Sequence, residues 1–173
     1  CCGSAAADNK FSVDTTGITQ PIAYDSTTTL PVKITSTEGF AGFKVYVYNS
    51  DPAVSVQINT SLSEEEGLNG MYTFNTEGDP LVVVFAKTTD YSSGTKMAFY
   101  VDVTPSSSAK EAVLDLEVVE VKKVSGDVTS SFSAEDCTLS VQIAPSVATR
   151  VVITEPVDNT ELAYGAEGVA TAV

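Results

Sequence analysis

The sequence of 173 residues contains no histidine and no tryptophan. Histidine is the commonest general base near neutral pH and the commonest protein ligand of transition metals, so its absence argues against catalysis and against a zinc-type site. Sites that bind sugar rings usually present flat aromatic side chains, and the lack of tryptophan therefore counts against a carbohydrate-binding cleft.

Positive charge and cysteine are also scarce. Nine Lys and Arg residues face 23 Asp and Glu residues, for a net charge of −14, and such a surface repels nucleic acid and anionic lipid. Of three cysteines, Cys137 stands alone and is expected to be a core thiol. Two interpretations of Cys1 stay open: the lipidated end of a bacterial lipoprotein, or the start of a linker. No apolar run reaches the length of a membrane span.

The residues that are abundant, Val, Thr and Ser, favour strands, and the stretch 112–124 shows this most clearly. Leucines alternate there with Asp115 and Glu117, as in a strand with one buried and one solvated face. The alternation slips after Val118, which predicts a β-bulge at that point.

Turn residues divide the remaining chain into short apolar segments, a pattern typical of a β-sandwich. We predict an all-β fold, a nine-stranded antiparallel sandwich over 10–145, with Greek-key or jelly-roll connections. Residues 1–9 are predicted to be a leader or linker. Residues 146–173 are predicted to be a C-terminal linker or tail, with membership of the domain left open. The expected strands are 11–14, 28–35, 41–49, 54–58, 71–75, 81–86, 96–104, 112–124 and 137–143.

Motifs for chemistry are missing. The sequence has no Gly-rich phosphate loop, no Cys or His metal spacing and no nucleophile elbow. Asp51, Asp79 and Asp90 are interpreted as turn carboxylates, and the Asp-x-Asp-x-Asp-Gly calcium loop does not occur. The acidic run Glu64–Glu66 is interpreted as a solvated loop or one helical turn. We expect no catalytic residue, no metal site and no cofactor in this chain.

One outward-facing side of the expected sheet carries several apolar and aromatic residues. If Val83 and Phe85 fill the core, Val82 and Val84 point outward, and Tyr46 and Tyr48 do the same on a neighbouring strand. Tyrosine offers apolar area with a polar tip, which protein interfaces favour. The pattern favours a flat protein-binding face; the alternatives are a tail or loop packed over this face, or ordinary exposed tyrosines.

Several segments occur in an order that is moderately specific. They are Leu30-Pro31-Val32-Lys33-Ile34, the run from Gly39-Phe40-Ala41-Gly42-Phe43 through Tyr48-Asn49-Ser50-Asp51-Pro52-Ala53-Val54, the strand end Val83-Val84-Phe85-Ala86, and the strands at 97–104, 112–124 and 138–143. From about Lys10 to Ile143 this order resembles a cohesin module, the receptor domain of cellulosome-type scaffoldins. The chain departs from the family by an inserted Asn49-Ser50, by Lys87 where many cohesins carry an acid, and by Lys44 where Asp is frequent. With these departures the chain resembles a divergent cohesin, similar to those of ruminococcal systems.

The resemblance implies a jelly-roll sandwich that is not an enzyme and captures the dockerin of an enzyme or scaffoldin. Such a module assembles an extracellular, cell-surface complex that degrades polysaccharide, and calcium is expected in the dockerin partner. Family contacts lie on the sheet of strands eight, three, six and five, in agreement with the outward face derived above. The implied dockerin-binding residues are Lys44, Tyr46, Tyr48, Tyr72, Val82, Val84, Ala86, Lys87, Asp115, Glu117 and Val119.

Two other functions remain open from the residues alone. A carbohydrate-binding module uses a similar sandwich but usually displays Trp or Tyr platforms. A structural Ig-like or adhesin domain needs no adhesive face at all. Binding to a dockerin, or to a polysaccharide, distinguishes the three.

Overall fold

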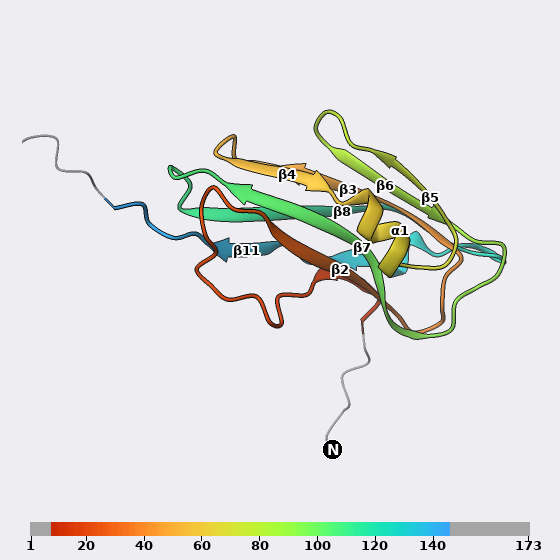
Figure 1. The fold of residues 1–173 in the computed structure, drawn as a ribbon. Helices are drawn as coiled ribbons and strands as arrows, with labels where there is room; N and C mark the ends of the chain where they lie inside the picture. Colours follow the sequence, from red (N-terminus) through yellow and green to blue (C-terminus); the bar gives the residue numbers. More distant parts are fainter. Residues whose placement is uncertain (1–7, 146–173) are drawn as a thin grey trace, which may run out of the picture. The chain divides into compact units, whose positions relative to one another are not determined.

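Alternating apolar residues bury one face of each strand, and the computed structural model shows residues 8–145 as two packed β-sheets (Figure 1). The described part of the chain holds eleven strands, two of them only two residues long, and one α-helix. The strands are β1 (Lys10–Val13), β2 (Thr28–Ser36), β3 (Gly42–Asn49), β4 (Val54–Ile58), β5 (Met71–Asn75), β6 (Leu81–Ala86), β7 (Gly94–Pro105), β8 (Glu111–Lys123), β9 (Gly126–Asp127), β10 (Ser133–Ala134) and β11 (Cys137–Ser140); the helix α1 spans Thr60–Glu66, and a 3-10 turn spans Thr129–Ser131.

The chain passes back and forth between the two sheets. One has the order β10-β1-β2-β7-β4 and the other β11-β8-β3-β6-β5, with β9 paired to β8. The strand pairings are antiparallel except for the parallel pair of β1 with β10. Because consecutive strands often belong to different sheets, much of the chain crosses between the layers. The predicted all-β sandwich is confirmed.

Aromatic and β-branched side chains from both sheets fill the core. Phe43 of β3 stacks on Phe85 of β6 with ring centroids 5.6 Å apart, and Phe11 meets Phe43 edge-on at 5.1 Å. Phe99 approaches the same ring from the other sheet at 6.3 Å. Each such buried ring contributes about 1.5–3 kcal/mol relative to an exposed one. Cys137 is half-buried on β11 and packs against this core.

Two β-bulges set which residues face outward. In the pairing of β3 with β8, Val45 lies opposite Val118 and Lys44 opposite Glu120, so Val119 is the extra residue and the predicted bulge is confirmed. A second bulge in β7 makes Ala98 the extra residue, because Phe99 faces Val32 and Met97 faces Lys33. Strict alternation over 96–104 predicts that Met97 points inward with Phe99, and the bulge makes that prediction wrong.

Pro31 lacks a backbone N–H, so its position in β2 must be one where no ladder partner needs that donor, as at an edge or a bulge. β2 lies inside its sheet, but the β1 pairing ends at Val32, opposite Val13. The carbonyl of Pro31 accepts a hydrogen bond from Asp14 just beyond that end. Since the N and C=O of a strand residue point to the same side, the missing N–H of Pro31 faces a position without a ladder partner.

Some segments are more ordered than the sequence pattern indicated. The acidic run belongs to α1, which packs on β7 and is capped by the Asn59 side chain, 3.0 Å from the Leu62 N–H. Asn9 accepts a hydrogen bond from the Thr37 N–H at 2.6 Å, so the fold holds the chain from this residue on.

Within residues 8–145 no helix is long and apolar enough to cross a membrane. The expected tail at 146–173 lies outside the described residues.

Candidate protein-binding face

The solvent-facing side of β8, β3, β6 and β5, called the outer face below, is positioned by strand alternation. On β6, Leu81, Val83 and Phe85 are at most 6% exposed, which leaves Val82 and Val84 on the opposite side. Residues directly opposite each other on paired strands point to the same side of the sheet, so the register identifies the outward residues of β3 and β8 as well. The predicted residues that the register places on the outer face are Lys44, Tyr46, Tyr48, Val82, Val84, Ala86, Asp115 and Glu117.

The centre of the outer face combines apolar and polar groups. Tyr46 lies opposite Val82 on one side and Glu117 on the other, and its ring meets that of Tyr48 edge-on at 6.3 Å. The Tyr48 hydroxyl donates a hydrogen bond of 2.6 Å to the Glu117 carboxylate. This bond raises the pKa of Tyr48 to about 12, since the phenol must stay protonated to donate. The bond also holds the Tyr48 ring in one orientation.

Tyr72 does not belong to the outer face. It pairs with Phe85, whose side chain is buried, and its ring stacks on Phe74 at 5.3 Å. Its hydroxyl donates to the Ala98 carbonyl of β7 and accepts from the Leu68 N–H at 2.8 Å. Burial raises its pKa to about 12. The placement predicted for Tyr72 is wrong. On β5 the aromatic residues Tyr72 and Phe74 face the core, and Met71, Thr73 and Asn75 face outward.

Two further predicted residues lie at the margins of the outer face. Lys87 follows the end of β6, and its Nζ stands 4.3 Å from the centroid of the Tyr91 ring, a cation–π contact. Val119 is the extra residue of the β8 bulge and is partly exposed. Beyond this bulge the outward positions on β8 are Glu120 and Lys122.

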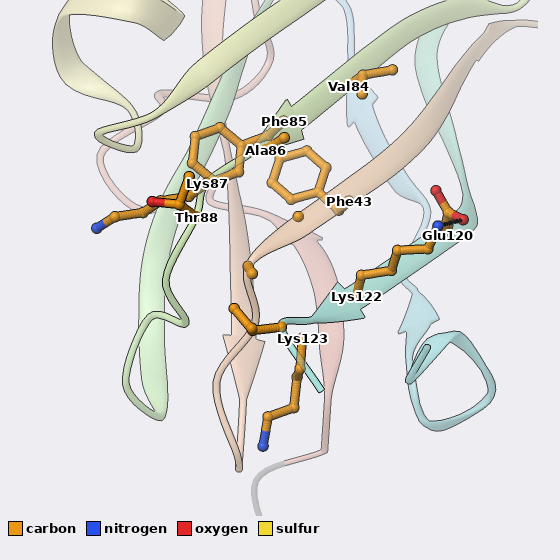
Figure 2. A pocket seen from close by; sticks show the side chains of 12 residues that line it. Phe43, Val84, Phe85, Ala86, Lys87, Thr88, Glu120, Lys122 and Lys123 are labelled. Carbon is orange, nitrogen blue, oxygen red and sulfur yellow. Dashed lines mark ion pairs between the residues drawn. The ribbon is translucent and has the colours of Figure 1, made fainter. Parts of the chain in front are cut away.

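A hollow of about 460 Å³ lies at one end of the outer face, and Figure 2 shows its lining. Gly42 of β3 carries no side chain there, and its partner on β6 is the small Ala86. A Cβ on Gly42 would come 2.8 Å from the Phe85 carbonyl oxygen, so the close approach of β3 and β6 requires glycine. Charged side chains of Lys87, Glu120, Lys122 and Lys123 surround this small-residue floor.

The sequence interpretation missed part of the face. Met71 is 76% exposed on the edge strand β5 and lies opposite Ala86, while Thr73 lies opposite Val84. The sequence signal was incomplete, because the aromatic residues Tyr72 and Phe74 alternate with these two positions but the alternation does not say which side faces the core. Glu120 and Lys122 were missed because the bulge reverses the phase of β8 after Val118.

Comparisons with known proteins give a structural likeness and no sequence match. No protein-family model matches the chain, and no curated protein matches it in sequence. A non-cellulosomal cohesin from the archaeon Archaeoglobus fulgidus has a TM-score of 0.58 at 17% identity, over 79% of this chain and 92% of that one. The sixth cohesin of the Acetivibrio cellulolyticus scaffoldin B, solved with a Cel5 dockerin, has a TM-score of 0.57 at 17% identity, over 78% and 99%. A ScaB cohesin from R. flavefaciens, solved with a group 1 dockerin, has a TM-score of 0.50 at 15% identity, over 80% and 99%.

These likenesses define the class of fold. The chain has the jelly-roll β-sandwich of the cohesin module, and the resemblance predicted from its segments is confirmed at that level. The sheet order β8-β3-β6-β5 is also the strand order that the resemblance implied for the binding sheet.

Proposed function

We propose that this chain is a non-catalytic protein-binding module that captures a dockerin on its outer face. The observation that carries the proposal is the sheet β8-β3-β6-β5, which presents Tyr46, Val82 and Val84 on its outer face between charged margins. An apolar centre with a polar rim is the composition of protein interfaces. The similar structures from A. cellulolyticus and R. flavefaciens, both cohesins solved with dockerins, support the same partner.

The setting of the module is part of the proposal. The captured dockerin would bring an enzyme or a scaffoldin to an extracellular, cell-surface complex that degrades polysaccharide, which this chain would contact only indirectly. The similar archaeal cohesin is described as non-cellulosomal, so the fold occurs outside cellulosomes as well. The calcium required for binding would reside in the dockerin. Among residues 8–145 no cluster of three or more Asp, Glu, Cys or His side chains is arranged to hold a metal ion.

A panel of purified dockerins tests the proposal by isothermal titration calorimetry, with calcium and with EDTA. We expect at least one dockerin to bind with a dissociation constant below about 1 μM, as a stable complex of standard interface size allows. EDTA is expected to abolish the binding. If no dockerin binds while cellulose, starch or xylan does, the proposal fails and the carbohydrate-binding alternative replaces it.

The geometry of the tyrosines gives that alternative little support. The rings of Tyr46 and Tyr48 are inclined at 83° to each other, so they do not form one flat platform for stacked sugar rings. Sugar binding is nevertheless the second arm of the panel, because both rings are partly exposed.

A further inference from the structure

Positive charge gathers at one end of the outer face. Among the described residues there are eight lysines and no arginine, and four of these lysines, Lys44, Lys87, Lys122 and Lys123, lie in or beside the hollow floored by Gly42. The opposite end carries Asp115 and Glu117, as well as Asp79 in the loop before β6. The outer face of a chain with a net charge of −14 is thus basic at one end only.

The carboxylates near the hollow leave part of this positive charge uncompensated. Glu120 pairs with Lys122 at 2.6 Å, and both side chains are about half-exposed, so the pair is weak and exchanges readily. Lys44 and Lys87 lie over Tyr46 and Tyr91, and within residues 8–145 neither has a carboxylate oxygen within 4 Å.

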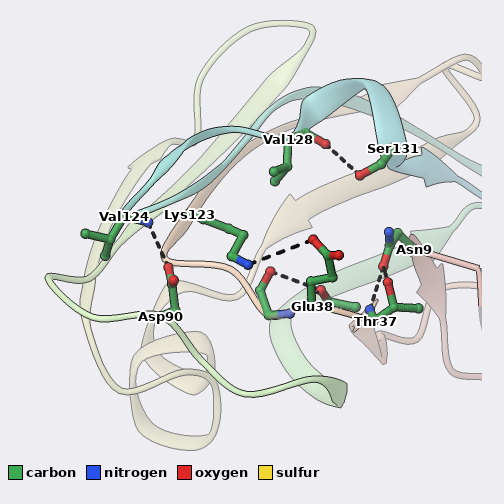
Figure 3. Close-up of polar contacts among 10 residues, drawn as sticks. Asn9, Thr37, Glu38, Asp90, Lys123, Val124, Val128 and Ser131 are labelled. Carbon is green, nitrogen blue, oxygen red and sulfur yellow. Dashed lines mark hydrogen bonds and ion pairs between the residues drawn. The ribbon is translucent and has the colours of Figure 1, made fainter.

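Other acidic groups around the hollow are already engaged. Figure 3 shows the Asp90 carboxylate accepting from the Val124 N–H, at 2.8 Å, and Glu38 approaching Lys123 at 3.9 Å. Asp127, opposite Lys122 on β9, accepts from the Thr129 N–H at 2.8 Å. These carboxylates contact the rim, and none of them lines the hollow itself.

From this arrangement we infer that the hollow receives an acidic side chain of the docked protein. Gly42 and Ala86 leave the space for it, and Val84 supplies the adjoining apolar contact. Lys87 and Lys122 line the hollow from the end of β6 and from β8, and their ammonium groups would turn from the Tyr91 ring and from Glu120 to pair with the carboxylate. The charge difference between the two ends of the outer face then selects one direction of docking. The inference extends the proposed protein-binding role, and it does not require the partner to be a dockerin.

The test uses a phage-displayed two-helix scaffold whose exposed face is randomised. The library is selected on the full wild-type chain and depleted on the Val84→Asn variant, which adds no charge, so that binders of the outer face remain. We expect Asp and Glu to be enriched in the selected sequences. Their affinity is expected to fall about tenfold or more on Lys87→Glu/Lys122→Glu, because the carboxylate then faces like charges.

Lys110→Glu is the control: it reverses one positive charge, as Lys122→Glu alone does, and it lies before β8, at the end remote from the hollow. It is expected to leave affinity within about twofold. Lys122→Glu alone, at an exposed site, replaces the double variant if circular dichroism shows that the latter is unfolded. The inference is overturned if the selected binders lack acidic enrichment, or if they bind the charge-reversed variant as tightly as the wild type. A dockerin panel that fails leaves this test intact, because the library contains no dockerin.

Discussion

At the scale of single residues, Val84 shows how alternation and pairing decide a role. Its neighbours in sequence, Val83 and Phe85, are 0% and 1% exposed, while Val84 itself faces solvent between Lys44 and Thr73. Three adjacent apolar residues therefore contribute to two different surfaces. A substitution at Val84 changes the binding face and leaves the core intact.

Val84→Asp is expected to weaken dockerin binding by more than about 100-fold, because the interface loses the valine contact and must bury a carboxylate, whose desolvation costs about 3 kcal/mol even beside Lys44. Calorimetry measures the loss, and circular dichroism is expected to show an unchanged fold. Ser55→Asp is the control, since it places the same charge on the exposed side of β4 in the other sheet. Normal binding by Val84→Asp would place the interface elsewhere, and unfolding would contradict the strand phase.

The bond from Tyr48 to Glu117 makes a second prediction. It is the main cause that raises the pKa of Tyr48 to about 12, so Glu117→Gln should lower that pKa toward the ordinary value of 10. A group whose pKa is raised by folding stabilises the fold below its unfolded pKa, and this contribution is lost as the pH rises from about 10 to about 12. Ultraviolet titration of tyrosinate, with Tyr48→Phe to identify the transition, measures the shift. An unchanged titration curve in Glu117→Gln would contradict the assignment.

At the scale of secondary structure elements, bulges decide which residues meet. A strand that gains one residue turns every later side chain to the other face, so Val121 points into the core although it follows Val118 by an odd number of residues. The bulge at Val119 thus brings Glu120 and Lys122 to the rim of the hollow. The bulge at Ala98 has the opposite effect on Met97, which leaves the core side.

The contact between β5 and β7 through Tyr72 is a structural link between the two sheets. Tyr72→Phe removes the hydroxyl that bonds the Ala98 carbonyl and the Leu68 N–H, so both lose a partner. We expect the free energy of unfolding to fall by about 1–3 kcal/mol, while dockerin affinity stays unchanged. Urea unfolding and calorimetry measure the two quantities. Tyr46→Phe, whose hydroxyl bonds no described residue, should change stability by less than about 0.5 kcal/mol. A loss of binding without a loss of stability in Tyr72→Phe would return this residue to the interface.

At the scale of the whole molecule, α1 lies against the edge of β7 beyond the end of β4, in the sheet opposite the outer face. The helix packs on β7, where the Ser63 hydroxyl accepts from the Tyr100 N–H at 2.9 Å. The sheet β11-β8-β3-β6-β5 has no such helix among the described elements.

The segment 8–145 by itself is expected to contain everything that folding and dockerin binding need. Its thermal unfolding midpoint should lie within about 3 °C of that of the full chain, since a shift of this size corresponds to less than about 1 kcal/mol. Scanning calorimetry with and without EDTA measures this, and EDTA is expected to leave both midpoints unchanged. A lower midpoint for the segment would show that 1–7 or 146–173 contribute to the domain. A drop in EDTA would contradict the assignment of calcium to the partner alone.

The sequence by itself determined the fold class and the position of the longer strands, but not the two-residue strands β9 and β10 or the end of β11 at Ser140. The alternation in 81–86 and 112–118 follows the period of two that a strand imposes, and this period is a local property of the chain. The outward positions of Tyr46, Tyr48 and Val82 followed from it directly. The order of the segments then led to the cohesin fold.

Only the tertiary structure decided the phase of β5, the lysine-rimmed hollow and the links between sheets. Tyr72 and Phe74 alternate like any amphipathic strand, and only the pairing of β5 with Phe85 shows that the aromatic side is buried. Gly42, Ala86 and Lys122 are distant in sequence and meet because β3 pairs with both β6 and β8. Alternation fixes which residues share a face of one strand, whereas register between strands fixes which faces and charges come together in space.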